Sequence, residues 1–510
     1  MKKKRFNFLW YLLFGLIFGL AAAVIILCAW YHRTYNVGFR ELLYTLLGPL
    51  KGTGNSVVQL VISSCLPPIL WCLLGYVLVS FLLSENRLNR RLWTLGGRRF
   101  PQRLLAWLRR AGAALCAGLM VFACWYANMK FDVTGYLLSL KDTTDIYETE
   151  YVDPEEVSIT APEKKRNLIY IVAESLETTY LSQEEGGWQK HNLMPRLTAL
   201  AQENLYFPGE NTPSGLNNLS GTSWTMASLL AQTSGIPFAF PVDGNAMEIQ
   251  EYFAPRLTTL GDILAEQGYA QEFLCGSDAS FAGRRKYFTQ HGGYEIFDLF
   301  TAREKGYIEE DYYVWWGYED FRLFEIARDE VTRLAAQEQP FNLTLLTVDL
   351  HHLGGFVCEE CDVDYGATTA DVVGCTDRLI GEFVAWCREQ PFYEDTTIII
   401  VGDHPRMDSY LVEEAPDDMR TLYHCVINPA VQVQNPDQNR VCTMLDLFPT
   451  TLAAMGFRVE GDRLGLGMNL LCGRPTLAEM LGLQTLDEEL VKTSQFYLDH
   501  FYYNTSGGAR

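Results

Sequence analysis

Acidic residues are scarce in the first 130 residues of this 510-residue chain, and basic residues are the scarcer kind in the rest. Residues 1–130 carry 16 Lys and Arg but only two acidic residues, Glu41 and Glu85, which gives +14. The other 380 residues carry 25 basic against 60 acidic side chains, or −35, and the whole chain is at −21. A chain of this length predicts more than one separately organised region. The acidic part lacks the basic stripe that binds a phosphate backbone, so we expect no nucleic-acid partner.

Charged residues are missing altogether from three apolar runs, at about 8–30, 57–83 and 111–127. Such runs are long enough to cross the roughly 30 Å hydrocarbon core of a bilayer. Helices buried in a soluble core seldom stay apolar all round for about twenty residues. A cleaved signal peptide has an apolar region of only roughly 7 to 15 residues. We therefore predict that residues 1–130 form a membrane anchor with about three transmembrane helices.

Basic residues are concentrated before the first apolar run and between the second and the third. Cytoplasmic segments carry the excess of Lys and Arg, so both of these segments are predicted to be inside the cell. Three crossings then place everything after about Ala127 outside, which makes this a multi-pass cell-membrane protein with an extracytoplasmic domain. The basic residues are Lys2, Lys3, Lys4, Arg5, Arg87, Arg90, Arg91, Arg98, Arg99, Arg103, Arg109 and Arg110.

Cysteines in the outer part suggest a covalent link. Cys358, Cys361 and Cys375 lie close together in the sequence, and an extracytoplasmic compartment permits oxidation. A CxxC pair can also hold zinc, but neither a second CxxC nor a His pair at zinc-finger spacing follows it. The pattern favours a disulfide among these three residues.

The outer part divides into an acidic connector at 131–165, a linker or wrapping arm, and a domain at 166–505. Short β-prone apolar runs at 167–174, 341–348 and 396–401 alternate with helix-like stretches such as the one that carries Leu257, Leu260, Ile263 and Leu264 before Gly268. This alternation predicts an α/β fold with a mostly parallel central sheet covered by helices. In such folds chemistry collects at the carboxyl ends of the strands. Glu174, His351 and Asp403 each fall at such an end.

Acidic strand ends indicate a metal site. Glu174 ends one predicted strand, and Asp403 with His404 follows another. Two carboxylates and an imidazole suit Mn, Zn or Mg. A strand-terminal Asp is often only a helix cap, but the joint placement of the two acids favours coordination of one cation.

Hydroxyl side chains are crowded into the segment 217–225, just before a helix-like run that starts at Met226. Hydroxyls at a helix start are usually caps. They also lie where free backbone N–H groups and the helix dipole favour an alkoxide or a phosphate. The spacing alone does not decide between a capping role and a catalytic or phosphate-binding role.

A set of motifs resembles a known family. In chain order they are NLIYIVAESLE, SGTSWTMASLLAQTSGIP, DASFAGRRKYF, LLTVDLHH, VGDH and DLFPT, spread over about residues 165–460. Together with several N-terminal spans, they look like the sulfatase-type domain of lipoteichoic acid synthases and of the phosphoglycerol transferases that decorate periplasmic glucans. The resemblance implies an alkaline phosphatase superfamily fold. It also implies a metal-bound threonine that takes a phosphoglycerol group from phosphatidylglycerol.

The resemblance assigns roles residue by residue. Glu174, Asp403 and His404 match the metal ligands, and Thr222 matches the nucleophile, itself a metal ligand. Counting from Ser228 and Gly235 as in sulfatases, the nucleophile falls instead on Thr225; we prefer Thr222 because the membrane-anchored families are nearer relatives. Arg284 and His351 fall where the synthases bind glycerol phosphate. Ala282 is a departure, since the synthases have Trp there, and we expect the head-group pocket to be wider or built differently.

The implied reaction passes through a phosphothreonine to a polyglycerol phosphate, glycolipid or glucan acceptor. Manganese is the metal that the resemblance favours, with Mg and Zn as alternatives. His351 and His352, adjacent at a strand end, are expected to point to opposite faces. A phosphoethanolamine transferase is the closest rival. A sulfatase fits less well, because the nucleophile segment lacks the CxPxR or SxPxR context, and a catalytically dead binding module would not need all four of Glu174, Thr222, Asp403 and His404.

Overall fold

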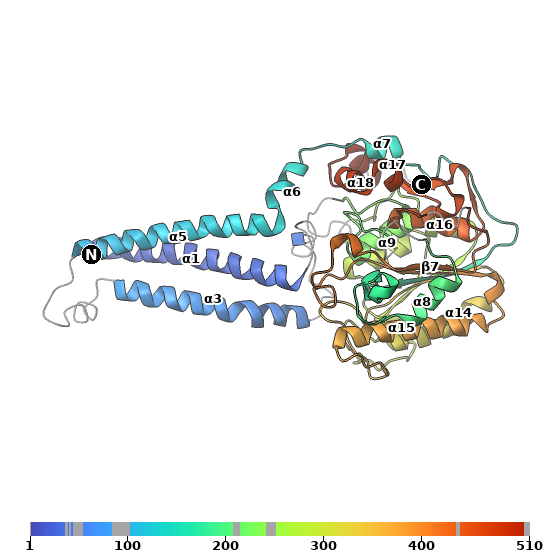
Figure 1. Cartoon of the computed structure of the whole chain (residues 1–510), viewed down its shortest axis with the longest axis horizontal. Helices are drawn as coiled ribbons and strands as arrows, with labels where there is room; N and C mark the ends of the chain where they lie inside the picture. The colour runs from blue at the N-terminus through green and yellow to red at the C-terminus, as the bar shows by residue number, and fades with distance from the viewer. Residues whose placement is uncertain are drawn as a thin grey trace. The chain divides into compact units, whose positions relative to one another are not determined.

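The structure is a computed structural model of the chain (Figure 1). It describes residues 2–35, 39, 42–43, 55–83, 102–207, 215–240, 251–434 and 439–503. The chain forms two compact units, one made mainly of residues up to Leu138 and one that runs from Ser139 to the C-terminus.

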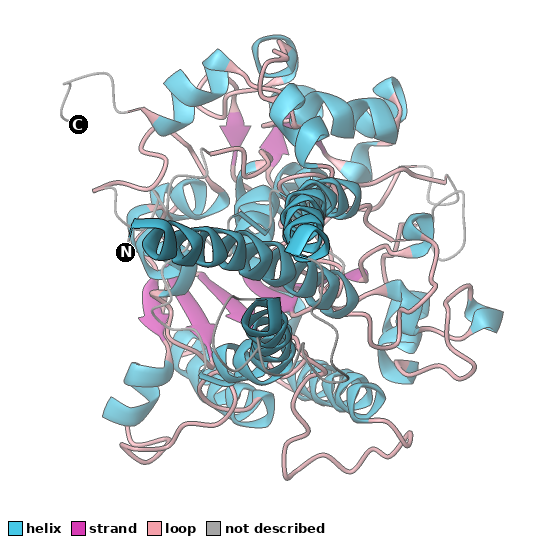
Figure 2. Cartoon of the chain, turned by 90° about the vertical axis from the view of Figure 1, so that its left-hand side faces the viewer, coloured by secondary structure: helices cyan, strands magenta, loops and turns pink. Residues whose placement is uncertain are grey.

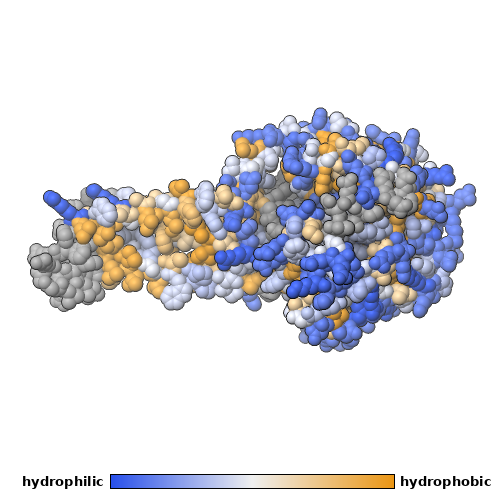
Figure 3. All heavy atoms as spheres, viewed as in Figure 1, coloured by the Kyte–Doolittle hydropathy of each residue, from blue (hydrophilic) through white to orange (hydrophobic). Residues whose placement is uncertain are grey.

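The first unit consists of three long helices, α1 (Lys2–Thr34), α3 (Asn55–Leu83) and α5 (Gln102–Phe131). Trp10–Thr34, Gln59–Leu83 and Ala106–Phe131 are each long and apolar enough to cross a membrane. Figure 3 shows apolar side chains along these helices. The Tyr76 hydroxyl donates to the Tyr11 carbonyl oxygen at 2.7 Å, which ties α3 to α1. The arginines at 87–99, which carry the predicted inside orientation, lie outside the described residues.

The second unit is built on a six-stranded sheet in the order β4-β3-β5-β2-β6-β7. The three predicted strands are present as β2 (Asn167–Ala173), β5 (Phe341–Leu346) and β6 (Thr396–Gly402), and they are adjacent and parallel. β3 (Ala270–Cys275) and β4 (Glu295–Phe297) extend the parallel part, and β7 (His424–Ile427) closes the other edge antiparallel to β6. The predicted mostly parallel α/β fold is confirmed.

Both faces of this sheet are covered by helices, as Figures 1 and 2 show. Ile169 and Ile171 of β2 pack into one apolar core with α8 (Pro195–Glu203), α14 (Asp320–Ala335) and α15 (Thr368–Arg388). Leu168 and Tyr170 pack into the other core with α9 (Thr225–Ser234), α11 (Leu260–Glu266), α12 (Arg284–Gln290) and α16 (Leu447–Ala454). Because alternate strand residues point to opposite faces, a continuous apolar run is what a strand buried on both sides requires. Leu257 precedes α11, whose N-cap is Thr259.

The residues at 139–160 wrap over the C-terminal part of the second unit. The Thr144 N–H donates to the Thr493 carbonyl oxygen at 3.1 Å, and the Val152 N–H donates to Gly465 at 2.9 Å. β1 (Ile159–Thr160) pairs with β8 (Arg458–Val459). The remaining elements are α6 (Val133–Ser139), α7 (Ile146–Glu150), α13 (Leu299–Glu304), β9 (Arg463–Leu464), β10 (Gly467–Met468), α17 (Leu477–Leu481), α18 (Leu483–Leu490) and α19 (Gln495–Tyr497).

A disulfide joins Cys361 to Cys375, so the predicted disulfide among the three neighbouring cysteines is present. Cys358 is a buried free thiol. The bond ties the loop after β5 to the first half of α15.

Candidate active site

Glu174, Asp403 and His404 meet at one edge of the central sheet. β2 and β6 are parallel neighbours with Ala173 opposite Gly402, so the residues that follow the two strands emerge side by side. One ligand atom of each residue lies within 4.8 Å of the others. All three side chains are buried, with at most 2% of each residue exposed. The structure thus brings together the two acids and the imidazole that the sequence predicts as metal ligands.

Local hydrogen bonds hold the three side chains in place. Asp403 Oδ1 accepts from the backbone N–H groups of Ser175 and His404, at 2.7 and 2.8 Å. His404 Nδ1 lies 2.9 Å from the Pro405 carbonyl oxygen and must donate to it, which leaves Nε2 with a free lone pair in the neutral ring. That nitrogen lies 3.3 Å from Asp403 Oδ2 and 3.5 Å from Glu174 Oε1.

The surroundings of Asp403 Oδ2 indicate whether a cation fits between these three side chains. It is buried, and no hydrogen bond reaches it from the described residues. A buried carboxylate oxygen without a donor is costly, and it faces the imidazole nitrogen and the second carboxylate. Two carboxylates and one imidazole are an O and N donor set that suits a divalent cation, so the residues present fit such an ion.

The pKa shifts at this cluster arise from burial and from the charges of the neighbouring side chains. Burial, and then the Glu174 carboxylate, raise the pKa of Asp403 to about 7. Burial also pushes the pKa of Glu174 upward, but His351 and His404 outweigh it and hold that pKa below its ordinary value. Burial lowers the pKa of His404, yet Asp403 and Glu174 together bring it above the usual range. Two buried carboxylates with oxygens within 4.8 Å of each other need positive charge beside them, which a proton or a metal ion supplies.

Thr225 is the hydroxyl that the fold places against this cluster. It is the first residue of α9, and its Oγ1 lies 3.5 Å from Glu174 Oε2 and 3.4 Å from His404 Nε2. Its side chain is partly exposed, whereas the three predicted ligands are buried. A substrate can therefore reach Thr225 from solvent while the groups behind it stay dry.

Thr222, the hydroxyl preferred from the sequence, is used inside its own turn. It is fully buried, and its Oγ1 donates to Asn218 Oδ1 or to the Leu219 carbonyl oxygen, at 3.1 and 2.8 Å. The same oxygen accepts from the Leu219 N–H at 3.0 Å. The structure brings Thr225 to the cluster and leaves Thr222 in a loop-closing role. The Ser228 and Gly235 spacing was the signal that pointed to Thr225.

The helix that begins at Thr225 is fixed at its far end by Gly235. This residue caps α9 at φ +68°, and a Cβ there would lie 2.7 Å from the Leu464 carbonyl oxygen. Gly235 also accepts a hydrogen bond from the Leu466 N–H at 2.8 Å. At the near end, the Asp487 carboxylate accepts from the backbone N–H and the hydroxyl of Ser220, at 2.6 and 3.1 Å. The turn that carries Thr225 is thus held from both sides.

Arg284 and His351 follow two further parallel strands of the sheet, β3 and β5. The Arg284 guanidinium is buried and donates from Nη2 to Ser277 Oγ and to the Asp278 carbonyl oxygen, at 3.1 and 2.8 Å. His351 is partly exposed, and its Nδ1 donates to the His352 carbonyl oxygen at 3.0 Å, which leaves Nε2 as an acceptor.

Burial lowers the pKa of His351, and the positive charge of Arg284 adds to that effect, whereas Glu174 opposes it. His351 therefore lies within the fields of both the acid cluster and the guanidinium. The expectation that His351 and His352 point to opposite faces is wrong, because both follow the end of β5 and their ring centroids lie 4.1 Å apart.

A buried ionic network braces the loops that carry these residues. Arg406 makes a bidentate pair with Asp408, and it donates to the Leu350 carbonyl oxygen at 3.1 Å. Asp408 accepts from the Gly354 N–H at 2.8 Å, and Glu177 accepts from Arg420 and from the Arg406 N–H. Nothing in the sequence pattern singles these residues out, since their partners lie in different loops.

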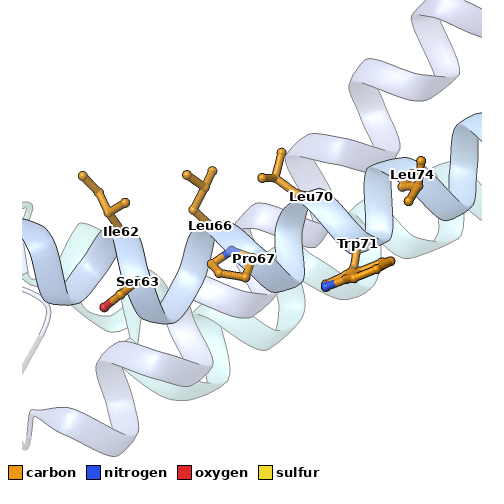
Figure 4. Close-up of a pocket in the computed structure, with 7 residues that line it drawn as sticks. All are labelled: Ile62, Ser63, Leu66, Pro67, Leu70, Trp71 and Leu74. Carbon is orange, nitrogen blue, oxygen red and sulfur yellow. The ribbon is translucent and has the colours of Figure 1, made fainter.

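One shallow apolar hollow lies elsewhere, on the outer face of α3 (Figure 4). Its lining residues come from a single membrane-type helix and carry no ionisable group, so it offers no chemistry. They are Ile62, Ser63, Leu66, Pro67, Leu70, Trp71 and Leu74.

Comparison with known proteins adds to this geometry. The sulfatase family model matches residues 166–457. Phosphoglycerol transferase I of Xanthomonas euvesicatoria pv. vesicatoria is 34% identical over 255 residues, which cover 49% of this chain and 35% of that protein. Phosphoglycerol transferase I of Salmonella choleraesuis is 31% identical over 379 residues, covering 71% of this chain and 46% of that protein. The chain thus spans less than half the length of these two relatives.

A solved structure is also similar. A protein in the alkaline phosphatase superfamily from Vibrio parahaemolyticus aligns with a TM-score of 0.49 and 21% identity, covering 67% of this chain and 80% of that chain.

Proposed function

The chain belongs to the sulfatase family, and we propose that it is a membrane-anchored, metal-dependent transferase that moves a phosphoglycerol group from phosphatidylglycerol to an acceptor hydroxyl. The observation that carries this proposal is the placement of the Thr225 hydroxyl 3.5 Å from Glu174 and 3.4 Å from His404. The relatives named phosphoglycerol transferase I support phosphoglycerol as the group that is moved.

Glu174, Asp403 and His404 hold one divalent cation in this proposal. Manganese is our choice, with Mg and Zn as alternatives, because the mixed O and N donor set does not select among them. When bound, the cation lowers the pKa of a hydroxyl beside it and neutralises charge on phosphoryl oxygens. Thr225 replaces Thr222 as the nucleophile, because its oxygen lies against two of the three ligands and the Thr222 oxygen bonds within its own turn.

The reaction has two half-steps. Thr225 Oγ1 attacks the lipid phosphorus, its bond to phosphorus forms, and the bond from phosphorus to the diacylglycerol oxygen breaks. In the second half-step the acceptor hydroxyl attacks the same phosphorus, and the bond to Thr225 breaks. Each half-step is a displacement at phosphorus, so positioning and electrostatic stabilisation account for most of the catalysis.

His351 moves the proton within each half-step. Its Nδ1 is committed to the His352 carbonyl oxygen, so Nε2 exchanges the proton. Nε2 takes the proton of the Thr225 hydroxyl in the first half-step and gives it to the departing diacylglycerol oxygen. In the second half-step it takes the proton of the acceptor hydroxyl and returns it to Thr225 Oγ1 as the bond to phosphorus breaks. The lowered pKa of His351 keeps Nε2 unprotonated and ready to accept a proton at the start of each half-step. Arg284 binds the phosphate oxygens, since a guanidinium forms paired hydrogen bonds with them.

The three apolar helices anchor residues 1–130 in the membrane, where the donor lipid also resides. We place the catalytic domain, residues 166–505, at the outer face of the membrane, joined through residues 131–165. The acceptor belongs to the cell envelope and is a polyglycerol phosphate chain, a glycolipid or a glucan.

The direct test uses full-length protein in vesicles of phosphatidylglycerol or of phosphatidylethanolamine, with Mn²⁺ or with a chelator. We expect diacylglycerol release from phosphatidylglycerol that depends on metal. Peptide mass spectrometry of protein trapped without an acceptor should find a phosphoglycerol adduct on Thr225. Diacylglycerol release from phosphatidylethanolamine alone would show that phosphatidylglycerol is not the donor. An adduct on Thr222 would show that Thr222, and not Thr225, is the nucleophile.

A further inference from the structure

Trp316 packs against His351 and against Phe281, the residue three positions before Arg284. Its ring centroid is 4.4 Å from that of His351 and 5.8 Å from that of Phe281. The Arg284 guanidinium lies over the ring of the same Phe281, 5.6 Å from its centroid. Trp316 is 8% exposed, so its indole is mostly enclosed by this group of side chains. The indole of Trp316 therefore lies next to His351, and the ring of Phe281 connects it to the Arg284 guanidinium.

The turn that carries Trp316 is rigidly held. The Val314 and Gly317 backbones exchange two hydrogen bonds of 2.8 Å, and the Tyr318 N–H donates to the Gly276 carbonyl oxygen at 2.9 Å. A Cβ on Gly317 would lie 2.0 Å from that same oxygen, so the turn contacts the 276–278 loop more closely than any other residue would allow.

The same loop also fixes Arg284. Its Ser277 hydroxyl and Asp278 carbonyl oxygen accept the guanidinium hydrogen bonds. One backbone segment thus sets the positions of the guanidinium and of the indole turn together. Binding sites are built in this way, with a few placed polar groups beside an apolar or aromatic wall.

We propose that Trp316 forms the wall against which the carbon chain of the transferred glycerol packs, and that it limits the size of the head group. The inference rests on the proposed function, because it takes Arg284 and His351 as the phosphate-binding groups. The phosphate oxygens occupy those groups, so the glycerol carbons need an apolar neighbour, and an indole face provides one. Glu174 and Asp403 offset the charge of a divalent cation, so the charge that remains is that of Arg284, which favours the neutral glycerol over an ammonium head group.

Calorimetry with glycerol phosphate tests the wall without requiring turnover. Metal-loaded full-length protein with Trp316→Ala should bind glycerol phosphate about tenfold more weakly, because the contact with the glycerol carbons is lost. Trp316→Phe should restore most of the affinity, since it keeps an aromatic face. Inorganic phosphate should bind the wild type and both variants alike, because it has no carbon chain to pack.

Trp315→Ala is the matched control. Trp315 is the neighbouring indole of the same turn, and it stacks on Phe356 at 6.0 Å instead of on His351. Its removal should leave glycerol phosphate affinity within about twofold of the wild type. Equal losses in the Trp315 and Trp316 variants, or an equal loss of inorganic phosphate binding, would overturn the proposal, since either would reflect a disturbed turn.

Kinetics with phosphatidylglycerol vesicles give the second readout. Trp316→Ala should raise KM about tenfold with kcat within about threefold, the signature of binding lost equally from ground and transition states. A loss confined to kcat would contradict a wall role. If the wild type binds glycerol phosphate but releases no diacylglycerol, the proposed reaction fails and the calorimetric comparison still decides the role of Trp316.

Discussion

Thr225 Oγ1 lies 3.5 Å from Glu174 Oε2, although the two residues are separated by 51 positions in the chain. Glu174 leaves the carboxyl end of β2, and Thr225 begins α9, the helix that packs over that end of the sheet. A hydroxyl at a helix start and an acid at a strand end meet here because a parallel sheet directs its strand ends to one edge. The positive end of the helix dipole then lies where a phosphate would dock.

The two threonines should respond differently to removal of their hydroxyls. Thr225→Ala should lower kcat by several orders of magnitude with the fold intact, because no other hydroxyl contacts both Glu174 and His404 among the residues that the structure describes. Thr222→Ala should instead cost about 1–2 kcal/mol of stability through its lost loop hydrogen bonds. Diacylglycerol release and thermal unfolding of both variants separate the two roles. Abolished turnover in a stable Thr222 variant would return the nucleophile to that residue.

Removal of the metal should lower stability as well as activity. Without a cation, Asp403 and Glu174 repel each other in a buried site, so a chelator should lower Tm and added Mn²⁺ should restore it. Asp403→Asn should lower metal content per protein, measured by elemental analysis, because an amide lacks the ligand charge. Asp395 is a half-buried acid paired with Lys164, so Asp395→Asn is the control and should leave the metal content unchanged. Unchanged metal content in the Asp403 variant would exclude this cluster as the site.

The buried network behind the site should be sensitive to a single change. Arg406 and Asp408 have fully buried side chains, so Asp408→Asn leaves a guanidinium without its counter-charge. Such a loss costs about 3–5 kcal/mol of unfolding free energy. Glu203→Gln, which removes the exposed partner of Arg388, should cost less than about 1 kcal/mol. Urea unfolding of both variants measures the two losses of unfolding free energy. Equal losses would show that the buried Arg406–Asp408 pair stabilises the fold no more than the exposed Arg388–Glu203 pair.

The stability of the second unit should fall with acidity through His424. Burial lowers the pKa of this imidazole from 6.5 to about 4, and Nε2 accepts from the Phe207 N–H at 2.9 Å. Because the unfolded chain binds this proton more tightly, the contribution is fully present above pH 6.5 and is lost as the pH falls toward 4.

The expected loss from His424 over that range is about 3 kcal/mol. His424→Gln keeps an acceptor but does not titrate, so its unfolding free energy should fall less between these two pH values than that of the wild type. Urea unfolding at several pH values measures the difference, in which the titration of all other groups cancels. Parallel pH profiles for the two proteins would show that His424 is not the group responsible.

The sequence predicts the central strands and the metal cluster because both follow from short local patterns. A continuous apolar run indicates a strand buried on both faces, and an acid at its end falls at the reactive edge. β3, β4 and β7 are harder to predict, because Glu272 interrupts β3 and the other two are only three and four residues long.

The choice between Thr222 and Thr225 could not be settled from the sequence alone. Both hydroxyls lie in one short run, and only the helix start decides which of them faces Glu174. Trp316 and Arg406 were missed for a related reason, since each acts through contacts with loops far away in the chain.

The anchoring of α9 has a consequence for the time at which the site comes into being. Ser220 is held by Asp487, 267 residues further along, and the Pro237 carbonyl oxygen accepts from the Tyr497 hydroxyl across 260 residues. In a chain made from its N-terminus, the turn around Thr225 gains these contacts only after residues 487–497 have been synthesised. Until then these contacts do not hold the Thr225 turn in place beside Glu174 and His404. We therefore expect the site to be inactive in a partly synthesised chain, without a separate inhibitor.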